Sequence, residues 1–462
     1  MDEPSSPDRL SPAHAFSLIL TFCVISGIFI YLIISKNIVL GSGGGNWVYG
    51  YLDQKASLPL WIPAAGFSLI GMLIFLGSRM IRDHEKITLI GCFLIAVGLQ
   101  VILQSIYPIR MDRIVSSDIA NSFYTAALEH SPGEILSQFS TLAPDLPLHA
   151  RTNMPGKILL FQFLTLFSKD PQVLGYLIIA VSSLGGLLLY GICKFLFQDR
   201  RTALYAFVLY TLIPAKQEFL PILNTVTPVF ILLSLYLFLA YLNTKKRRYL
   251  ILLGISLYIL VLFEPSPLVT GILFAGILAH AIVHRKITWK EIAGLVLIPL
   301  LSFAATYLLF WWIFSFDLWQ AFQHIWTDAS DFNDREHRGY VVWLRENVKE
   351  FFYAVGLPVG MVFVYCAFDL LARWKEIIRG ARRWPLEWFY TCGLILTFGA
   401  VLFLGINRGE VTRLWIYLAV FFQVPAALFM ARQVKSNALF FILAGTILFQ
   451  TMISLQRIRF IL

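Results

Sequence analysis

Residues 15–35 read AFSLILTFCVISGIFIYLIIS, an apolar run without a charged side chain. At a rise of about 1.5 Å per residue, a helix of this length covers the roughly 30 Å hydrocarbon core of a bilayer. A helix also satisfies its own backbone hydrogen bonds, as a segment inside lipid must. The run is too long for a signal-peptide core and lacks a small-residue cleavage site, so we interpret it as a retained membrane anchor.

Runs of this kind recur along the chain and predict about thirteen spanning helices. The composition agrees, because 58% of the 462 residues are hydrophobic and only 14% are charged. A soluble protein would carry about 25% charged residues. No alternating pattern indicates a membrane β-barrel, so we expect an all-α polytopic membrane protein. The expected spans lie near 15–35, 59–78, 87–107, 172–196, 202–220, 225–243, 249–263, 267–284, 291–315, 350–372, 387–405, 412–431 and 437–455.

Basic residues are concentrated in short connections between these spans. With thirteen alternating spans, all of these connections fall on one side, which the positive-inside rule makes the cytoplasm. The same rule explains the net charge of +10 without a nucleic-acid partner. We therefore expect a multi-pass protein of a bacterial plasma (inner) membrane with a cytoplasmic N-terminus; only Arg457 and Arg459 would lie outside. The basic connections are 79–82, 199–201, 245–248, 284–286, 373–383 and 432–435.

Three parts of the chain follow from this division. Residues 1–107 form an N-terminal three-helix segment, and residues 108–170 form an extracytoplasmic loop with interfacial helices. Residues 171–462 form a transmembrane bundle with a second outer loop at 316–349. Long loops without a span are usually functional. Since no separate soluble domain is visible, a site must be built from loops and helix ends at the membrane surface.

The sequence holds no metal or nucleotide motif of known type. The stretch 327–338 is dense in charge, and its acids could hold a divalent cation through oxygen ligands. It lacks the glycine and terminal glutamate of an EF-hand loop, so we favour a solvated loop. A divalent cation is the only cofactor left open. No zinc spacing or disulfide framework is indicated, because all cysteines lie in apolar runs: Cys23, Cys92, Cys193, Cys366 and Cys392.

The long outer loop holds a carboxylate at the start of an expected helix. Ser117 could cap a helix that runs from Asp118 to about His130, where Pro132 would stop it. Asp118 could be held just above the bilayer as a base that takes a proton from an acceptor hydroxyl. Alternatively, it is an acid favoured at a helix start by the helix dipole. The local sequence pattern is compatible with both interpretations of Asp118, as a base and as a helix-start acid.

Cations follow at the end of the same loop. They are His149, Arg151 and Lys157. Asn153 lies among them, and Pro155 is expected to begin a short interfacial helix. Arginine can bind phosphate bidentately and lysine can act as a point charge. The alternative is snorkelling of these side chains to lipid headgroups.

A charged pair is expected near the C-terminus. Glu410 and Arg413 are three residues apart at the outer mouth of a helix, so they share a face. Arg413 would lie about one turn into the bilayer, where an unpaired charge costs on the order of 2.5–3.5 kcal/mol and is a functional candidate. The alternative is an ion pair that only packs helices. Glu218 and Glu264, at the outer ends of other spans, could line the same pocket or lie in solvated turns.

Taken in order, these segments resemble the membrane-embedded glycosyltransferases of the C class (GT-C), which include protein O-mannosyltransferases and lipid A aminoarabinose transferases. Members have an acidic residue in the first large outer loop, followed by a His/Lys-x-Pro-Pro-type segment that opens an interfacial helix. Asp118 matches the acid, and His149–Gly156 matches the second segment. Gly409–Trp415 is similar to a Gly-Glu-x-x-Arg phrase of uncharacterised bacterial members. The resemblance extends from about Pro108 onward.

The chain departs from the family pattern in two ways. A single proline, Pro155, stands where the family usually has two, and the acidic loop follows the third expected span instead of the first. These departures leave open whether Asp112 or Asp118 is the catalytic residue. We prefer Asp118, because the Ser-Asp-x-x-x-x-Phe-Tyr phrasing around it fits better and because arginines flank Asp112.

The resemblance implies transfer of a sugar from a polyprenyl-phosphate donor to an extracytoplasmic acceptor, which could be a cell-wall or cell-envelope glycan, a lipid or a protein. It implies Asp118 as general base. Preorganised cations would stabilise the charge that develops on the leaving phosphate. The donor phosphate and sugar would be bound by Arg413, Glu410, Arg151, Lys157, His149 and Asn153.

Three other functions stay open on the sequence alone. A transporter or flippase of lipid-linked saccharides would use the same cations but would need no base. Transporters often carry internal repeats, and none is visible here. A polymerase or ligase of surface polysaccharide and a non-catalytic scaffold in a membrane assembly are the other two.

Overall fold

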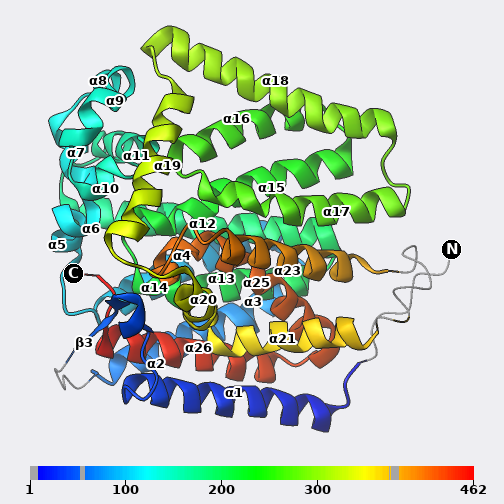
Figure 1. Cartoon of the computed structure of the whole chain (residues 1–462). Helices are drawn as coiled ribbons and strands as arrows, with labels where there is room; N and C mark the ends of the chain where they lie inside the picture. Colours follow the sequence, from blue (N-terminus) through cyan, green and yellow to red (C-terminus); the bar gives the residue numbers. More distant parts are fainter. Residues whose placement is uncertain (1–8, 53–57, 374, 376–383, 462) are drawn as a thin grey trace.

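The computed structural model describes residues 9–52, 58–373, 375 and 384–461. The described residues are mostly helical, and most of the long helices run roughly along one direction (Figure 1). The helices of the bundle are α1 (Pro12–Ile34), α2 (Trp61–Gly71), η2 (Met72–Leu76), α3 (Gly77–Met80), α4 (Glu85–Gln104), α12 (Pro171–Phe197), α13 (Arg200–Leu212), α15 (Thr227–Thr244), α16 (Arg248–Phe263), η5 (Ser266–Thr270), α17 (Gly271–Val283), α18 (Trp289–Phe314), α21 (Leu357–Ala372), α23 (Leu386–Leu404), α25 (Ile416–Phe429), η7 (Met430–Val434) and α26 (Asn437–Arg457).

Shorter elements gather at the left of Figure 1, and α19 and α20 lie with them. They include the four short strands of the described residues. These elements are β1 (Gly41–Ser42), η1 (Gly43–Gly45), β2 (Trp47–Val48), β3 (Gly50–Tyr51), α5 (Met111–Val115), α6 (Asp118–Asn121), α7 (Phe123–Glu129), α8 (Pro132–Ser137), α9 (Phe139–Leu142), η3 (Ala143–Asp145), α10 (Leu148–Arg151), α11 (Gly156–Thr165), α14 (Pro214–Glu218), η4 (Leu223–Thr225), α19 (Leu318–Arg335), α20 (Tyr340–Val355), α24 (Val411–Leu414) and β4 (Ile458–Arg459).

Ten helices of the described residues are long and apolar enough to cross a bilayer. The count is eleven if α20 and α21, which are bent by 111°, form one span. The two remaining expected spans are the shorter helices α13 and α16. The all-α membrane architecture is therefore confirmed, whereas length and composition do not establish the expected number of about thirteen.

The expected span at 350–372 is wrong in its boundaries, because the chain breaks at Gly356. Gly356 has φ +100°, a backbone conformation that suits glycine. The buried amide of Gln450 serves both sides of the break: it donates to the Tyr353 carbonyl at 2.9 Å and accepts from Leu357 N at 3.0 Å. A break inside a membrane protein needs such partners, because lipid supplies none. The break turns α20 away from the direction of α21.

The segment at 316–349 is helical, not an irregular outer loop. Asp317 caps α19 by accepting from the backbone N–H of Trp319 at 2.9 Å and of Gln320 at 3.1 Å. The loop favoured for 327–338 is instead helical as far as Arg335, where α19 ends. Most of this stretch is exposed, as expected of a solvated segment, but Arg338 is only 4% exposed.

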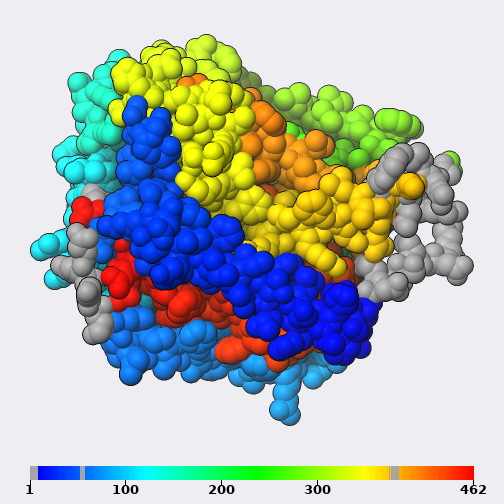
Figure 2. All heavy atoms as spheres, turned by 60° about the horizontal axis from the view of Figure 1, so that its bottom comes forward, coloured from blue at the N-terminus to red at the C-terminus, as the bar shows by residue number. Residues whose placement is uncertain are grey.

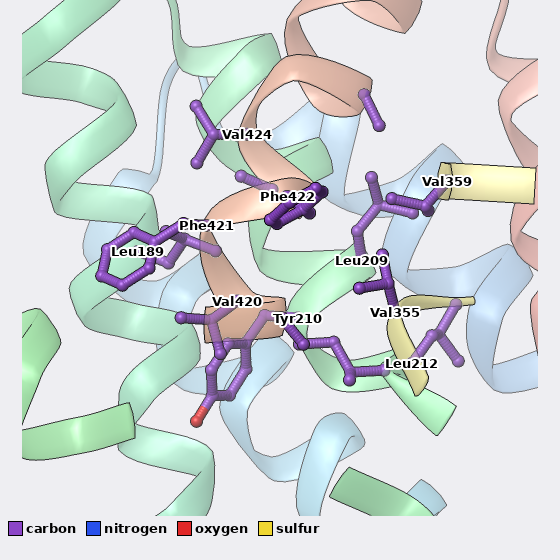
Figure 3. Close-up of a cluster of buried hydrophobic side chains, with 14 of the residues drawn as sticks. Leu189, Leu209, Tyr210, Leu212, Val355, Val359, Val420, Phe421, Phe422 and Val424 are labelled. Atoms are coloured by element: carbon purple, nitrogen blue, oxygen red, sulfur yellow. The ribbon is translucent and has the colours of Figure 1, made fainter. Parts of the chain in front are cut away.

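The centre of the bundle is α25, in which every residue is buried. Figure 3 shows its side chains Phe421 and Phe422 among those of α12, α13 and α21. By contrast, only 6% of the apolar window of α18 is buried, and this helix lies at the edge of the bundle. Figure 2 shows α1 lying across the opposite face, along α21 and α26. Helices inside a membrane associate by van der Waals packing, and apolar outward faces contact lipid.

Five of the six basic connections meet at one end of the bundle, called here the basic end. The sixth, 373–383, lies mostly outside the described residues. The contacts that join them are Arg200 Nη1 to Arg82 O (2.8 Å), Arg432 Nη2 to Phe197 O (3.0 Å), Arg432 Nη1 to Glu387 Oε1 (3.9 Å), Lys245 Nζ to Lys286 O (3.1 Å) and His284 Nε2 to Trp384 O (3.0 Å).

The opposite end, called here the loop end, is closed by the antiparallel pairing of β3 with β4. This pairing joins the connection after α1 to the segment after α26. At the basic end, Leu10 N donates to Gln433 O at 3.3 Å, so α1 begins beside the connection that precedes α26. The first described helix therefore begins at the basic end, and the last described strand lies at the loop end. The described chain must accordingly run from one end of the bundle to the other an odd number of times.

Candidate functional site

At the loop end, an ion pair joins the start of α11 to the residue after α16. Lys157 Nζ lies 3.0 Å from Glu264 Oε2, with side chains 1% and 10% exposed. Lys157 also donates to Asn153 Oδ1 at 2.8 Å, and Glu264 accepts from the Thr227 hydroxyl at 2.7 Å. Burial lowers the pKa of Lys157, and the carboxylate of Glu264 opposes this shift. The extra hydrogen bonds are what a buried ion pair needs to be stable.

Gly156 allows these two segments to approach. A Cβ atom on Gly156 would lie 2.5 Å from the backbone oxygen of Leu262 and 2.8 Å from Cα of Phe263. Only glycine fits there, since the nearest atoms belong to backbone that cannot rotate away. Pro155 precedes α11 as its N-cap residue, as the sequence predicts. The Pro-Gly pair therefore sets the distance between Lys157 and the end of α16.

A second network centres on Glu410, at the turn before α24. Its carboxylate lies 2.6 Å from Arg413 Nη2 and 3.0 Å from Arg338 Nη2. Burial alone would raise the pKa of Glu410, but the charges of Arg413 and Arg338 overcome this and lower it. Glu410 is therefore ionised at neutral pH. Because it binds two guanidinium groups, the cluster carries an excess positive charge.

His149, on α10, feels the charges of both networks. Burial and then the charge of Arg413 lower its pKa to about 4; Glu410 opposes this shift, and Lys157 adds to it. The His149 ring is thus close enough to feel both Arg413 and Lys157. Its helix α10 packs against α6, which begins at Asp118. At neutral pH the imidazole is uncharged, so it can both donate and accept a hydrogen bond.

Asp118 is exposed to water and is the first residue of α6. As predicted, Ser117 caps the helix that begins there, accepting from Ala120 N at 3.2 Å. The Asp118 carboxylate accepts a hydrogen bond from the Thr125 hydroxyl. The packing of α10 against α6 therefore brings the segment of Asp118 beside the helix that carries His149.

Asp112 occupies a different position. Both of its oxygens are held by Arg110, at 3.1 Å from Nε and 3.0 Å from Nη2. This bidentate pair lies at the surface on α5, where the Arg110 side chain is 73% exposed. Asp118 thus begins a helix that packs against the helix of His149, whereas Asp112 already has a cationic partner.

Two of the predicted phosphate ligands keep a buried N–H without a partner. Among the described residues, Nε of Arg151 and Nε of Arg413 have no hydrogen-bond acceptor. Asn153 is committed within the protein, because it donates to the His149 carbonyl at 3.0 Å and accepts from Lys157. Buried donors usually find an acceptor, so the two unpaired N–H groups are positions that an anionic ligand or water would satisfy.

Glu218 does not join the cluster described above. It is buried at the end of α14, 1% exposed, where the electrostatic effect of its carboxylate reaches Tyr353. Glu218 therefore lies neither in a solvated turn nor in the ion network. Glu264, by contrast, belongs to that network through its pair with Lys157.

Sequence reasoning missed Arg338, Glu350 and Trp343. Glu350 Oε2 accepts from Val411 N at 3.2 Å and so fixes the start of α24. Trp343 packs so closely that a Cβ atom on either Gly45 or Gly409 would lie 2.8 Å from its ring. The sequence signal for Trp343 was the presence of Gly45 and Gly409 in two connections at the loop end. Both glycines leave room for the ring of this tryptophan.

No group of three or more His, Cys, Asp or Glu side chains among the described residues could hold a metal ion, the stretch 327–338 included. Comparison of the chain with known protein families, with curated proteins and with solved structures finds no match.

Proposed function

We propose that this protein is a glycosyltransferase that moves a sugar from a polyprenyl-phosphate donor to an acceptor on the outer side of a bacterial plasma membrane. One observation carries the proposal: α10, whose His149 feels the charges of Arg413 and Lys157, packs against α6, which begins at the exposed Asp118. A carboxylate exposed to water thus adjoins a buried, positively charged cluster. Such a boundary suits a reaction between a lipid phosphate and an acceptor in water.

The chemistry assigned to these groups is a displacement at the anomeric carbon. The acceptor hydroxyl oxygen forms a bond to that carbon, and Asp118 takes the hydroxyl proton as general base. The bond between the anomeric carbon and the phosphate oxygen breaks, and its electron pair leaves with the polyprenyl phosphate. Arg413 and Arg151, each with an unpaired Nε–H, stabilise that departing charge. The neutral His149 is suited to hydrogen bond a sugar hydroxyl.

An apolar contact surface for the polyprenyl chain lies on α11, which carries Lys157, and on the residues directly after it. Beyond the buried first turn of α11, the side chains of Phe163, Leu166 and Phe167 are exposed by 56%, 78% and 68%. Large apolar side chains exposed together mark contacts with lipid or another apolar ligand. A donor whose phosphate meets the cluster could extend its chain along these residues.

We also propose that the basic end faces the cytoplasm, as the positive-inside rule requires, and that the loop end is extracytoplasmic. Thirteen crossings, with α13, α16 and the bent pair α20–α21 each counted as one, agree with the odd number that the ends of the described chain require. The candidate site would then lie at the outer membrane surface.

A transporter of lipid-linked saccharides is the second candidate, favoured by the 111° break between α20 and α21. Discontinuous helices are common at transporter sites. The two functions differ in what happens to the glycosidic bond, because transport leaves it intact. They also differ in their need for Asp118 as a base.

The deciding experiment uses the purified full-length protein in liposomes that contain a panel of radiolabelled polyprenyl-phosphate sugars. Envelope glycan and lipid fractions serve as acceptors. Transfer predicts that label moves into an acceptor fraction and that polyprenyl phosphate is released. Label that crosses the bilayer still attached to its lipid would instead establish the transporter and refute the glycosyltransferase.

A further inference from the structure

The basic end contains a pocket of about 680 Å³, far from the cluster around His149. It lies where α3, the start of α13 and the start of α26 meet. Its polar lining is dominated by cations, with one carboxylate among them. The cations and the acid are Arg79, Arg82, Arg200, Arg201, Lys435 and Asp199.

Two of these cations and the carboxylate are committed to the protein itself. Arg200 lies 3.3 Å from Glu85 Oε2, and Arg201 donates to Asn437 Oδ1 at 2.8 Å. Asp199 caps α13, accepting from the backbone N–H of Arg201 and Thr202 at 3.0 and 3.1 Å. These contacts fix the pocket wall. They also remove the only lining acid as a counter-ion for the remaining cations.

The other three cations have no such contacts. Within the described residues, no hydrogen bond or ion pair is made by the side chains of Arg79, Arg82 and Lys435. Arg79, Arg82 and Lys435 are all exposed. Three like charges around one hollow repel each other unless an anion lies between them. The charge of the pocket is therefore complementary to a phosphate group.

The backbone beside the pocket departs from regular α-helix, as backbone at functional sites often does. Both π-helical segments of the described residues border it: η2 contributes Phe75, and η7 ends directly before Lys435. Lys435 itself has φ +53°, which is uncommon for a residue with a side chain. π-Helical turns occur frequently at functional sites. Here one of them brings an aromatic ring, and the other a lysine, to the wall of the pocket.

The pocket also adjoins an apolar surface. Met72, Phe75 and Leu76 of η2 are exposed by 46%, 48% and 46%, and Phe75 lines the pocket. In a membrane protein this surface contacts acyl chains. An occupant that fits both features carries phosphate at one end and hydrocarbon at the other.

We propose that this pocket binds the phosphate-bearing headgroup of an anionic phospholipid, with its acyl chains along η2. The free guanidinium groups of Arg79 and Arg82 can bind phosphate oxygens bidentately, and Lys435 adds a point charge. Basic pockets between membrane helices recognise anionic headgroups in this way. If these cations only set the orientation of the helices in the membrane, they would need no pocket between them.

The test measures lipid binding by native mass spectrometry and by tryptophan quenching with brominated lipid, on full-length protein stripped of lipid in detergent. The ligands are phosphatidylglycerol, phosphatidylcholine and inorganic phosphate. The variant R79Q/R82Q/K435Q removes the free cations. The matched control K246Q/R247Q/K290Q removes three exposed cations of the same end that do not line the pocket. Thermal unfolding of each variant checks that it is folded.

We expect phosphatidylglycerol to bind the unaltered protein in preference to phosphatidylcholine. The pocket variant should weaken that binding on the order of 10- to 100-fold, since each basic residue near a membrane surface contributes measurably. The control should change it less than about 3-fold, and R79K/R82K should keep most of it. Equal losses in both triple variants, no preference for the anionic lipid, or saturation by inorganic phosphate at the same concentration would each overturn the proposal.

Discussion

Lys157 Nζ lies 3.0 Å from Glu264 Oε2 in a site from which water is almost excluded, although more than a hundred residues separate the two in the chain. Such a pair joins α11, at the end of the segment 108–170, to the end of α16. Removing either partner leaves a buried charge without its counter-ion. The structure thus makes this segment and the bundle dependent on each other.

The first prediction concerns this pair. Lys157→Met or Glu264→Gln alone should destabilise the protein by about 3–5 kcal/mol, the usual cost of an unpaired buried charge. The double substitution should cost clearly less than the sum of the two. Denaturant unfolding in mild detergent measures the three variants. A strictly additive double variant would show that the pair makes no net interaction.

The second prediction distinguishes Asp112 from Asp118, the two candidate bases of the segment 108–170. If the proposed function holds, Asp118→Asn should lower sugar transfer by about 10²–10⁴-fold, the range typical of a lost general base. Asp112→Asn is the matched control, because that carboxylate is held by Arg110 on the same segment. Its transfer rate should stay near that of the unaltered protein. The assay is the liposome reaction described above, and the reverse order of effects would move the base to Asp112.

The third prediction tests Arg413 as a phosphate ligand. Arg413→Lys keeps the charge near Glu410 but loses the guanidinium and its unpaired Nε–H. We expect donor binding to weaken about 10-fold, as for the loss of one charge-assisted hydrogen bond of about 1.5 kcal/mol. The unfolding midpoint should change little, since a cation is retained. Donor affinity that is unchanged, with a lowered midpoint, would make Arg413 a packing residue only.

A fourth prediction follows from the pKa of about 4 for His149. In the unfolded chain a histidine titrates near 6.5, so between these two values the unfolded state binds more protons. Stability should therefore be full above about pH 6.5 and fall as the pH drops towards 4, by on the order of 1–3 kcal/mol. His149→Gln should flatten this part of the stability profile. Thermal unfolding between these pH values measures it, and an equal slope in both proteins would rule out His149 as the source.

The fifth prediction is steric. Gly156→Ala would place a methyl group 2.5 Å from the backbone oxygen of Leu262 and force α11 away from α16. We expect a loss of stability of several kcal/mol or failure to fold, because overpacking against backbone is poorly relieved. Gly133→Ala is the control, since nothing lies within 4 Å of its added Cβ. Expression level and unfolding midpoint compare the two; equal behaviour would mean that the close approach is absent in solution.

The sequence predicted the long spans well, because an apolar run of about twenty residues has few other stable structures. It could not predict the break at Gly356. The apolar run continues through that position, and the break is stabilised by Gln450, on a helix almost a hundred residues later. Local pattern carries no information on such a partner.

In the candidate site, too, contacts between sequence neighbours could be predicted, whereas contacts made by the tertiary fold could not. Glu410 and Arg413 could be paired from their spacing, because they are neighbours on one helical turn. Arg338 was missed, since it ends a charged stretch that resembles a solvated loop, and only the tertiary fold brings it to Glu410. Lys157 and Glu264 were each proposed, but their contact depends on the approach that Gly156 permits.

The β3–β4 pairing has a consequence for biogenesis. Residues 50–51 emerge early in synthesis, yet their partners at 458–459 follow only after α26 has been made. Membrane insertion of the first helices therefore leaves a ribbon edge open until almost the whole described chain has been translated. The loop end, with the cluster around His149, can reach its final form only after that delay.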